Sequence, residues 1–303
     1  MAGGTTLTGG WQFVNPPKYY EEAATGYASV ITTATASGIF GKVSAISVET
    51  DPGTQEFRAV GSEDVYTQVI GRVGVRARIT FALVDTSSVF VSYAIKANAN
   101  AAGDISRPIH IVWSERTWEN GSTFLTTYFA LRGAKPNSLT IRGSAGNHLE
   151  GECEVIAHSL TYTTTASAFQ STFASEPTAD IWNFEDGGAN PVTWQSRAVD
   201  VTDFSFTVAR DLKPVYVLGS STVQFLFAGN RSITGDATVV YLSASTLADS
   251  LTATSGTMSW TMKSSAGTFT GTSTVITGHS LPQEISGETY ERITFKTGTV
   301  AAL

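Results

Sequence analysis

The chain has little cysteine and little charge, and each shortage argues against a class of protein. Cys153 is the one cysteine among 303 residues, so no internal disulfide can form and we expect a buried free thiol. Charged residues make up only 15%, and long Glu-, Lys- and Leu-rich stretches are missing, which argues against helix bundles and coiled coils. The formal net charge of −7 disfavours binding to nucleic-acid phosphates, but it is compatible with a protein that DNA must pass.

Signals for export and membrane insertion are also missing. The first ten residues, MAGGTTLTGG, contain no basic segment followed by an apolar one. No stretch approaches the roughly 18 apolar residues that a membrane span needs. We therefore expect a soluble protein that is not exported.

Patterns typical of catalysis and of metal or cofactor binding are missing as well. His110, His148, His158 and His279 are not spaced as metal ligands are. The sequence has no G-x-S-x-G elbow, no P-loop and no G-x-G-x-x-G turn. It therefore predicts no catalytic residues, no cofactor and no metal site.

The sequence does contain a weak internal repeat. Residues 41–85 align without a gap on residues 199–243, with Gly71 matching Gly229. In both copies apolar and polar residues alternate with the period of a strand that has one buried face. The apolar set of the first copy is Val73, Val75, Ala77, Ile79 and Phe81, and that of the second copy includes Ile233, Ala237 and Val239.

Behind these strands, each copy is expected to place one short helix. Asp85 and Ser243 are aligned, suit a helix N-cap, and precede apolar residues at helical spacing. Further on, we match elements in their order along the chain, in preference to a local match of His158 with His279 that leaves the second copy incomplete. The matched segments are 109–113 with 258–262, 124–131 with 269–276, and 150–156 with 290–295.

These patterns predict an all-β protein with two copies of one fold in tandem. The expected parts are an N-terminal arm over 1–25, a first domain over 26–160, a linker over 161–176 and a second domain over 177–303. The aromatic residues at the end of the arm predict that it either docks on a neighbouring molecule or folds back onto its own domain.

An acidic cluster is the most suggestive group of charges. A strand over 150–156 would project Glu150, Glu152 and Glu154 on one face and Cys153 on the other. Paired carboxylates can hydrolyse a glycoside, but no other feature indicates a cleft. We favour an exposed stripe that lines a passage or faces arginines across strands or between subunits, and the corresponding face of the second copy is largely uncharged. The candidate arginines are Arg72, Arg76 and Arg78.

Tryptophans offer a different reading, a platform that stacks on sugars. Core or interface packing is the commoner use of such residues. The candidates are Trp113, Trp118, Trp182, Trp194 and Trp260.

The second copy resembles a known family at its glycine turns. Residues 204–242 contain the steps Leu218-Gly219-Ser220, Gly229-Asn230-Arg231 and Thr234-Gly235, and residues 131–141 of the first copy are similar. These motifs resemble those of the duplicated tail tube proteins of long-tailed bacteriophages and related archaeal viruses.

The resemblance implies a structural virion protein and not an enzyme. Each copy would be a small β-sandwich or partial barrel with a helix on its flank. Subunits would form stacked rings whose inner strands close a channel for viral double-stranded DNA, with three chains in each pseudo-sixfold ring. The implied partners are further copies of the chain and the tape-measure, tail-terminator and baseplate or tip proteins, with no membrane. The implied location is the virion tail, after synthesis in the host cytoplasm; the alternative is an adhesin-like β-sandwich that binds carbohydrate.

Overall fold

The structure is all-β, as predicted. The strands are accompanied by a helix, α1 (Ser87–Ile95), which follows the predicted alternating strand, and by a 3-10 turn, η2 (Phe184–Gly187). Residues 248, 249 and 251 are also helical, and their immediate neighbours are not all described. The computed structural model describes residues 12–22, 34–51, 53, 55–58, 65–69, 73–95, 108–120, 123–165, 177–187, 192–241, 248–249, 251–263, 267–280 and 290–301.

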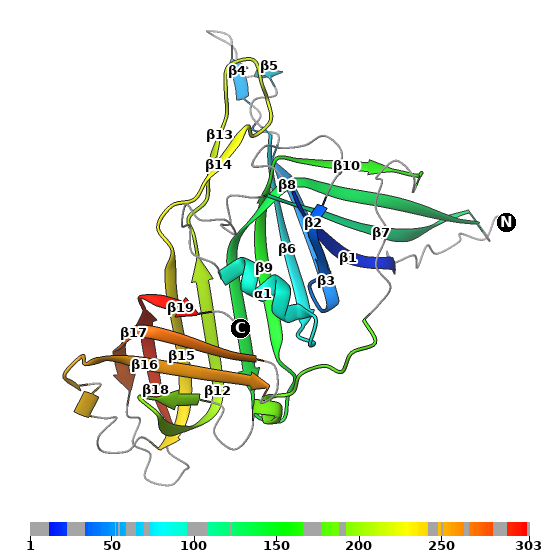
Figure 1. Ribbon diagram of the computed structural model, residues 1–303. Coiled ribbons are helices and arrows are strands. Elements are labelled where there is room, and N and C mark those ends of the chain that lie inside the picture. Colours follow the sequence, from blue (N-terminus) through cyan, green and yellow to red (C-terminus); the bar gives the residue numbers. More distant parts are fainter. Residues whose placement is uncertain are drawn as a thin grey trace, which may run out of the picture.

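The second half of the chain forms a closed barrel of six strands (Figure 1). Hydrogen bonds connect β11, β16, β17, β18, β15 and β12 in that order, and β12 pairs with β11 to close the ring. Gln195 and Ser196 join β11 to β12 with φ values of 49° and 64°, as a two-residue hairpin turn requires. The strand bounds are β11 (Val192–Trp194), β12 (Arg197–Ala209), β15 (Ser232–Tyr241), β16 (Ser255–Lys263), β17 (Gly267–Ser280) and β18 (Glu291–Thr297), with β19 (Thr299–Ala301) paired to β17 outside the ring.

The first half is open among the described residues. Strands β3, β6, β9 and β8 pair in that order, and the sheet continues from β8 through β7 and β1 to β2. The strand bounds are β1 (Gln12–Glu22), β2 (Ala34–Ile39), β3 (Lys42–Asp51), β6 (Gly74–Ala82), β7 (Ile109–Asn120), β8 (Thr123–Ser144), β9 (Glu150–Ala157) and β10 (Ser159–Thr163).

The long strand β8 joins the two halves. Its first part pairs with β7 and β10, whereas its last part pairs with β9 and with β12 of the second half. The partners change near Gly133, whose φ of 61° suits glycine, and near a register shift after Pro136. The last part, Ser138–Ser144, pairs with Asp203–Ala209, and we call this pairing the internal seam. One sheet therefore runs through both halves.

The two halves pair their strands in the same order. The series β3-β6-β9-β8 corresponds to β12-β15-β18-β17. Strands β9 and β10 both pair with β8, just as β18 and β19 both pair with β17. The element order expected from the sequence therefore agrees with the pairing. The expected match of 124–131 with 269–276 is wrong in register. Ser159 of β10 pairs with Arg132, and Thr299, which takes the position of Ser159 in β19, pairs with Thr272. Arg132 of β8 therefore corresponds to Thr272 of β17.

The N-terminal strand β1 makes the first half different. It lies between β7 and β2, whereas β11, which corresponds to β2, pairs directly with β16. Pro16 and Pro17 lie in a register shift between Asn15 and Lys18, because prolines cannot donate ladder hydrogen bonds. Of the two expectations for the arm, residues 12–22 follow the second and fold onto their own half.

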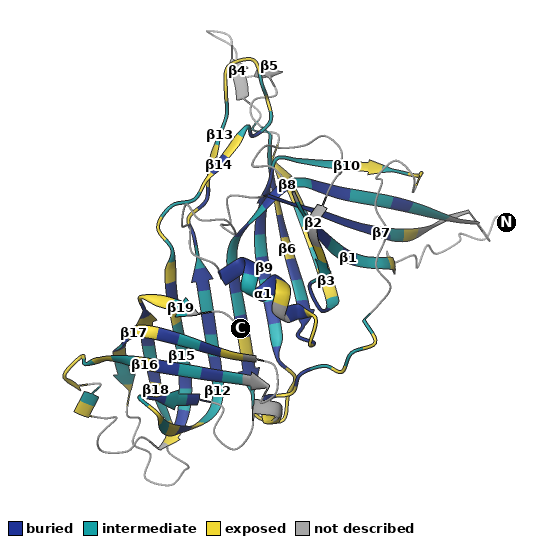
Figure 2. Cartoon of the chain, viewed as in Figure 1, coloured by how far each residue is buried: buried dark blue, intermediate teal, exposed yellow. Residues whose placement is uncertain are grey.

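Aromatic side chains build the core of the first half around α1. Tyr19 of β1 is 1% exposed and its ring lies 5.3 Å from that of Phe90 in α1 and 5.6 Å from that of Phe40. Burial raises the pKa of the Tyr19 hydroxyl. Phe81 of β6 also packs against Phe90, with the two rings edge to face. Figure 2 shows the buried residues alternating along the central strands.

The chain between the two halves packs on the first half. Residues 161–163, expected in the linker, continue β10, and residues 166–176 lie outside the described part. Trp182 donates its indole N–H to Asp85 (2.7 Å), and its backbone N–H bonds to Leu83. The residues that begin the expected second domain are therefore anchored on the first.

Two short hairpins project from one end of the sheet (Figure 1). They occupy corresponding places, one in each half. Their strands are β4 (Gln55–Arg58) with β5 (Val65–Val69), and β13 (Lys213–Val215) with β14 (Phe225–Phe227).

Candidate assembly surface

The sheet that crosses the internal seam has one apolar and one polar face. Residues of odd number in β6, such as Ile79 and Phe81, are buried, and Phe81 packs on Phe90 of α1. Arg76 and Arg78 are exposed on the opposite face of the strand. The alternation predicted for this strand is confirmed. We call the opposite side the polar face; its residues include Glu49, Arg76, Arg78, Thr140, Arg142, Glu152, Glu154, Ser205, Thr207, Asp236, Arg292 and Thr294.

The predicted acidic cluster lies on this polar face. Glu150, Glu152 and Glu154 alternate with buried residues of β9, and Cys153 is fully buried. Burial raises the pKa of the Cys153 thiol. Pairing with β6 and β8 brings the cluster beside arginines on both sides.

Glu152 is the centre of an ion-pair network. Arg78 approaches it from β6 (3.2 Å) and Arg142 from β8 (2.7 Å). Glu154 accepts a hydrogen bond from the Asn137 amide (3.2 Å). The Arg78 side chain is 63% exposed, so its pair contributes at most about 1 kcal/mol to stability. Arg76 lies on the same face, whereas Arg72 lies outside the described residues.

The second half repeats this pair with the charges exchanged. Asp236 takes the position of Arg78 and Arg292 takes that of Glu152, and the two lie 3.2 Å apart. Ser205 also donates to Asp236 (2.7 Å). The expectation that this face is largely uncharged in the second half is therefore wrong at these two positions. The ungapped alignment, which matches Arg78 with Asp236, carried the signal.

Contacts from the second half reinforce the internal seam. Thr140 and Thr207 share a hydrogen bond of 3.0 Å across it. The buried Arg210 donates to the carbonyl of Ala94, and Arg231 donates to that of Ile95 (2.7 Å). These carbonyls end α1, where helical groups lack internal partners and positive charge is favourable. Desolvation lowers the pKa of Arg231.

The projecting hairpin of the second half adds an apolar contact on the first half. Leu212, Val223 and Leu226 cover Ile156 at the end of β9. His158 donates from Nδ1 to the carbonyl of Val223. The two halves are thus joined by strand pairing, charged hydrogen bonds and apolar burial.

The series β3-β6-β9-β8-β12-β15-β18-β17, which crosses the internal seam, ends on each side in a strand edge that lacks a partner among the described residues. Strand β3 pairs with β6 on one side only, and Gly278–Ser280 of β17 pair only with β18. Unpaired edges present backbone N–H and C=O groups that favour addition of another strand. We call them the open edges.

The second hairpin exposes several apolar side chains. Phe225 and Phe227 are 53% and 61% exposed and their rings lie 6.2 Å apart, while Leu218 is fully exposed. Exposed apolar groups gathered in this way are typical of interaction surfaces.

Comparison with known proteins identifies the family. Residues 112–296 match the family described as phage tail tube protein. The chain belongs to this family. No curated protein matches it. The phage tail tube protein described here is therefore a structural component of the virion tail, in line with the resemblance of its glycine turns.

The four tryptophans whose side chains the structure describes do not form a sugar platform in this tail tube protein. Trp113, Trp182, Trp194 and Trp260 are each at most 2% exposed and belong to the core. The side chain of Trp118 lies outside the described part. Core packing, the commoner use of tryptophan, is what the structure shows for these four residues.

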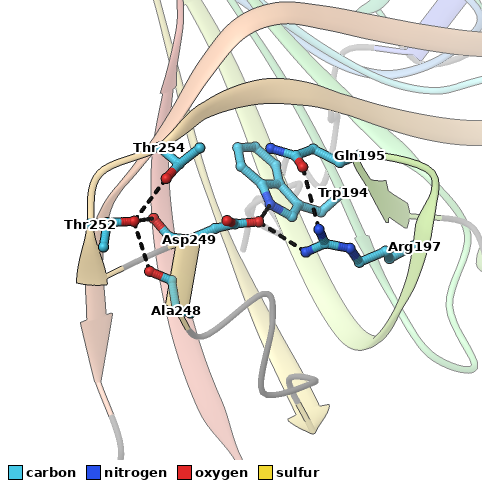
Figure 3. A network of polar contacts seen from close by, with 7 residues as sticks. All are labelled: Trp194, Gln195, Arg197, Ala248, Asp249, Thr252 and Thr254. Carbon is cyan, nitrogen blue, oxygen red and sulfur yellow. Dashed lines mark hydrogen bonds and ion pairs between the residues drawn. The ribbon is translucent and has the colours of Figure 1, made fainter.

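A polar network holds the hairpin turn of the tail tube barrel (Figure 3). Asp249 accepts hydrogen bonds from the Trp194 indole N–H (3.0 Å) and from Arg197 (2.9 Å). The bond from Trp194, aided by Arg197, lowers the pKa of Asp249. Thr252 bonds back to the carbonyl of Ala248 (2.9 Å). The network ties the turn between β11 and β12 to the segment before β16.

Other kinds of site were also sought in the tail tube protein. Within the described ranges, no three His, Cys, Asp or Glu side chains come together as a metal site requires. No helix in the described part of the chain has the length and apolar character to cross a membrane.

Proposed function

We propose that the chain is the major tail tube subunit, in which two tandem copies of one fold form two neighbouring segments of a ring wall. The internal seam carries this proposal. It joins four strands of each half, β3-β6-β9-β8 and β12-β15-β18-β17, into one sheet and leaves an open edge at each end. Repetition of the same contact between chains would close a ring, and three chains would give six wall segments.

The polar face would line the channel of this ring. DNA must move along such a surface without being held. The affinity of a protein for DNA rises with the number of Lys and Arg side chains that can neutralise a phosphate. Arg78, Arg142 and Arg292 each lie against a carboxylate of the same face. This pairing supports a channel that viral double-stranded DNA crosses without being retained.

Rings would stack through their ends to form the tube. The exposed Phe225 and Phe227 lie on a hairpin that projects beyond the sheet, which supports a contact along the tube axis. At its two ends and inside the channel, the tube would meet the tail-terminator, the baseplate or tip, and the tape-measure protein.

Electron microscopy of the purified full-length chain tests the proposal. At high concentration we expect rings of three chains, stacked into tubes, with the polar face towards the channel in a reconstruction. Native mass spectrometry of single rings counts the chains independently. A strictly monomeric protein would contradict assembly, and a ring of six whole chains would show that the second half is not part of the wall.

A further inference from the structure

The internal seam gives the register for contact between chains. The open edges belong to the strands that correspond to those already paired at the seam: β3 corresponds to β12, and β17 corresponds to β8. Each half therefore leaves unpaired the strand edge that the other half uses at the internal seam.

The residues that would meet follow from the pairing of each strand. Thr140 of β8 pairs with Glu152, whose other neighbour is Thr80; Ser280 of β17 pairs with Arg292, whose other neighbour is Thr238. Ser280 therefore takes the position of Thr140. By the same reasoning Glu49, which pairs with Arg76, takes the position of Thr207, which pairs with Thr234.

Thr140 and Thr207 lie opposite each other at the internal seam. We propose that Ser280 of one chain lies opposite Glu49 of the next chain, with Gly278 opposite Asp51, so that β17 and β3 continue the sheet from chain to chain. This inference rests on the proposed ring and specifies its contact.

The side chains at this contact are complementary. The Ser280 hydroxyl can donate to the Glu49 carboxylate where the internal seam has a bond between two threonines. Gly278 leaves room beside Asp51 because it has no side chain. Behind these small residues, β18 presents Arg292 and Lys296 on the same face, so an acidic edge meets a basic neighbour.

The contact between chains lacks the strongest support of the internal seam. Arg210 and Arg231, which hold the end of α1, correspond in sequence to Pro52 and Val73, and neither can donate a charged hydrogen bond. Exposed charged groups therefore account for a larger share of the binding energy between chains than they do at the internal seam. Salt screens the interactions of such exposed charges. Ring assembly should therefore weaken with rising ionic strength while each chain stays folded.

Disulfide cross-linking in the full-length chain tests the register. The variant Glu49→Cys with Ser280→Cys should give covalent dimers and trimers under mild oxidation, seen on non-reducing gels. Cys153 can stay, because it is buried and its raised pKa disfavours the reactive thiolate. The control Ser47→Cys with Ser280→Cys uses the same face two residues along β3, displaced by about 7 Å.

We expect roughly tenfold more covalent trimer from the first pair, because a disulfide does not form when the Cα atoms are more than about 7 Å apart. Rings that cross-link equally well through Ser47→Cys, or through neither pair, would overturn the register but not ring assembly. Neither rings nor cross-links in either variant would overturn the ring itself.

Discussion

In both halves of the chain, four strands that carry the polar face pair in the same order, and we call these strands the inner sheet. The halves differ in how the remaining strands are arranged. In the second half β11 pairs with β16 and closes a barrel, whereas in the first half β1 lies between β2 and β7. The order β3-β6-β9-β8 nevertheless matches β12-β15-β18-β17. The inner sheet therefore does not depend on barrel closure, and the N-terminal strand is an addition to one half. Each prediction below tests a feature found in one half only.

Loss of the Tyr19 ring should have the largest effect. Tyr19→Ala empties a fully buried site between β1 and α1, and such aromatic truncations cost about 3–5 kcal/mol. Urea unfolding followed by circular dichroism should show the free energy of unfolding lowered by that amount. Tyr19→Phe is the matched control: the hydroxyl has no hydrogen-bond partner among the described residues, so its removal should leave stability unchanged or raised. Equal losses in both variants would mean that the hydroxyl, and not the ring, fixes β1.

Removal of Arg210, which binds a carbonyl at the end of α1, should have the next largest effect. Arg210→Ala deletes a buried charged hydrogen bond to Ala94 and should cost about 2–3 kcal/mol. Arg231→Ala, whose side chain is only partly buried, should cost about 1 kcal/mol. Urea midpoints at constant m-value measure both. If the order were reversed, the partly buried Arg231 would be the main link between the halves.

The smallest effect should be a pH dependence of the barrel. Because the folded state lowers the pKa of Asp249, its stabilising effect is present above the ordinary aspartate pKa of about 4 and is lost as pH falls through the folded value. Asp249→Asn should lower Tm at neutral pH, and its difference from the parent should shrink in acid. A Tm difference that stays constant down to acid pH would exclude a role for this carboxylate charge.

Local patterns predicted much of the inner sheet. The alternation through Ile79 and Phe81 gave the buried face of β6, and that of Glu152 and Cys153 gave the orientation of β9. These features depend on a period of two residues, which a sequence displays directly. The charge exchange at Asp236 was also available from the alignment.

Long-range pairing explains what local patterns could not give. Nothing near Tyr19 indicates that its strand enters between β2 and β7, because the partners are distant in sequence. The register of β17 was misplaced because its bulges, such as that between Ile276 and Gly278, alter the spacing of apolar residues. The buried role of Arg210 was likewise missed, because an arginine after a strand usually indicates a solvated turn.

The internal seam also limits the composition of a ring built in the proposed way. Fused wall segments enter two at a time, so no ring can close with an odd number of them. Half of the contacts form when the chain folds, without a concentration-dependent step, and only the other half must be found by collision. The two segments of one chain need not be identical, and the exchanged charges of Arg78 with Glu152 and Asp236 with Arg292 are one difference between them.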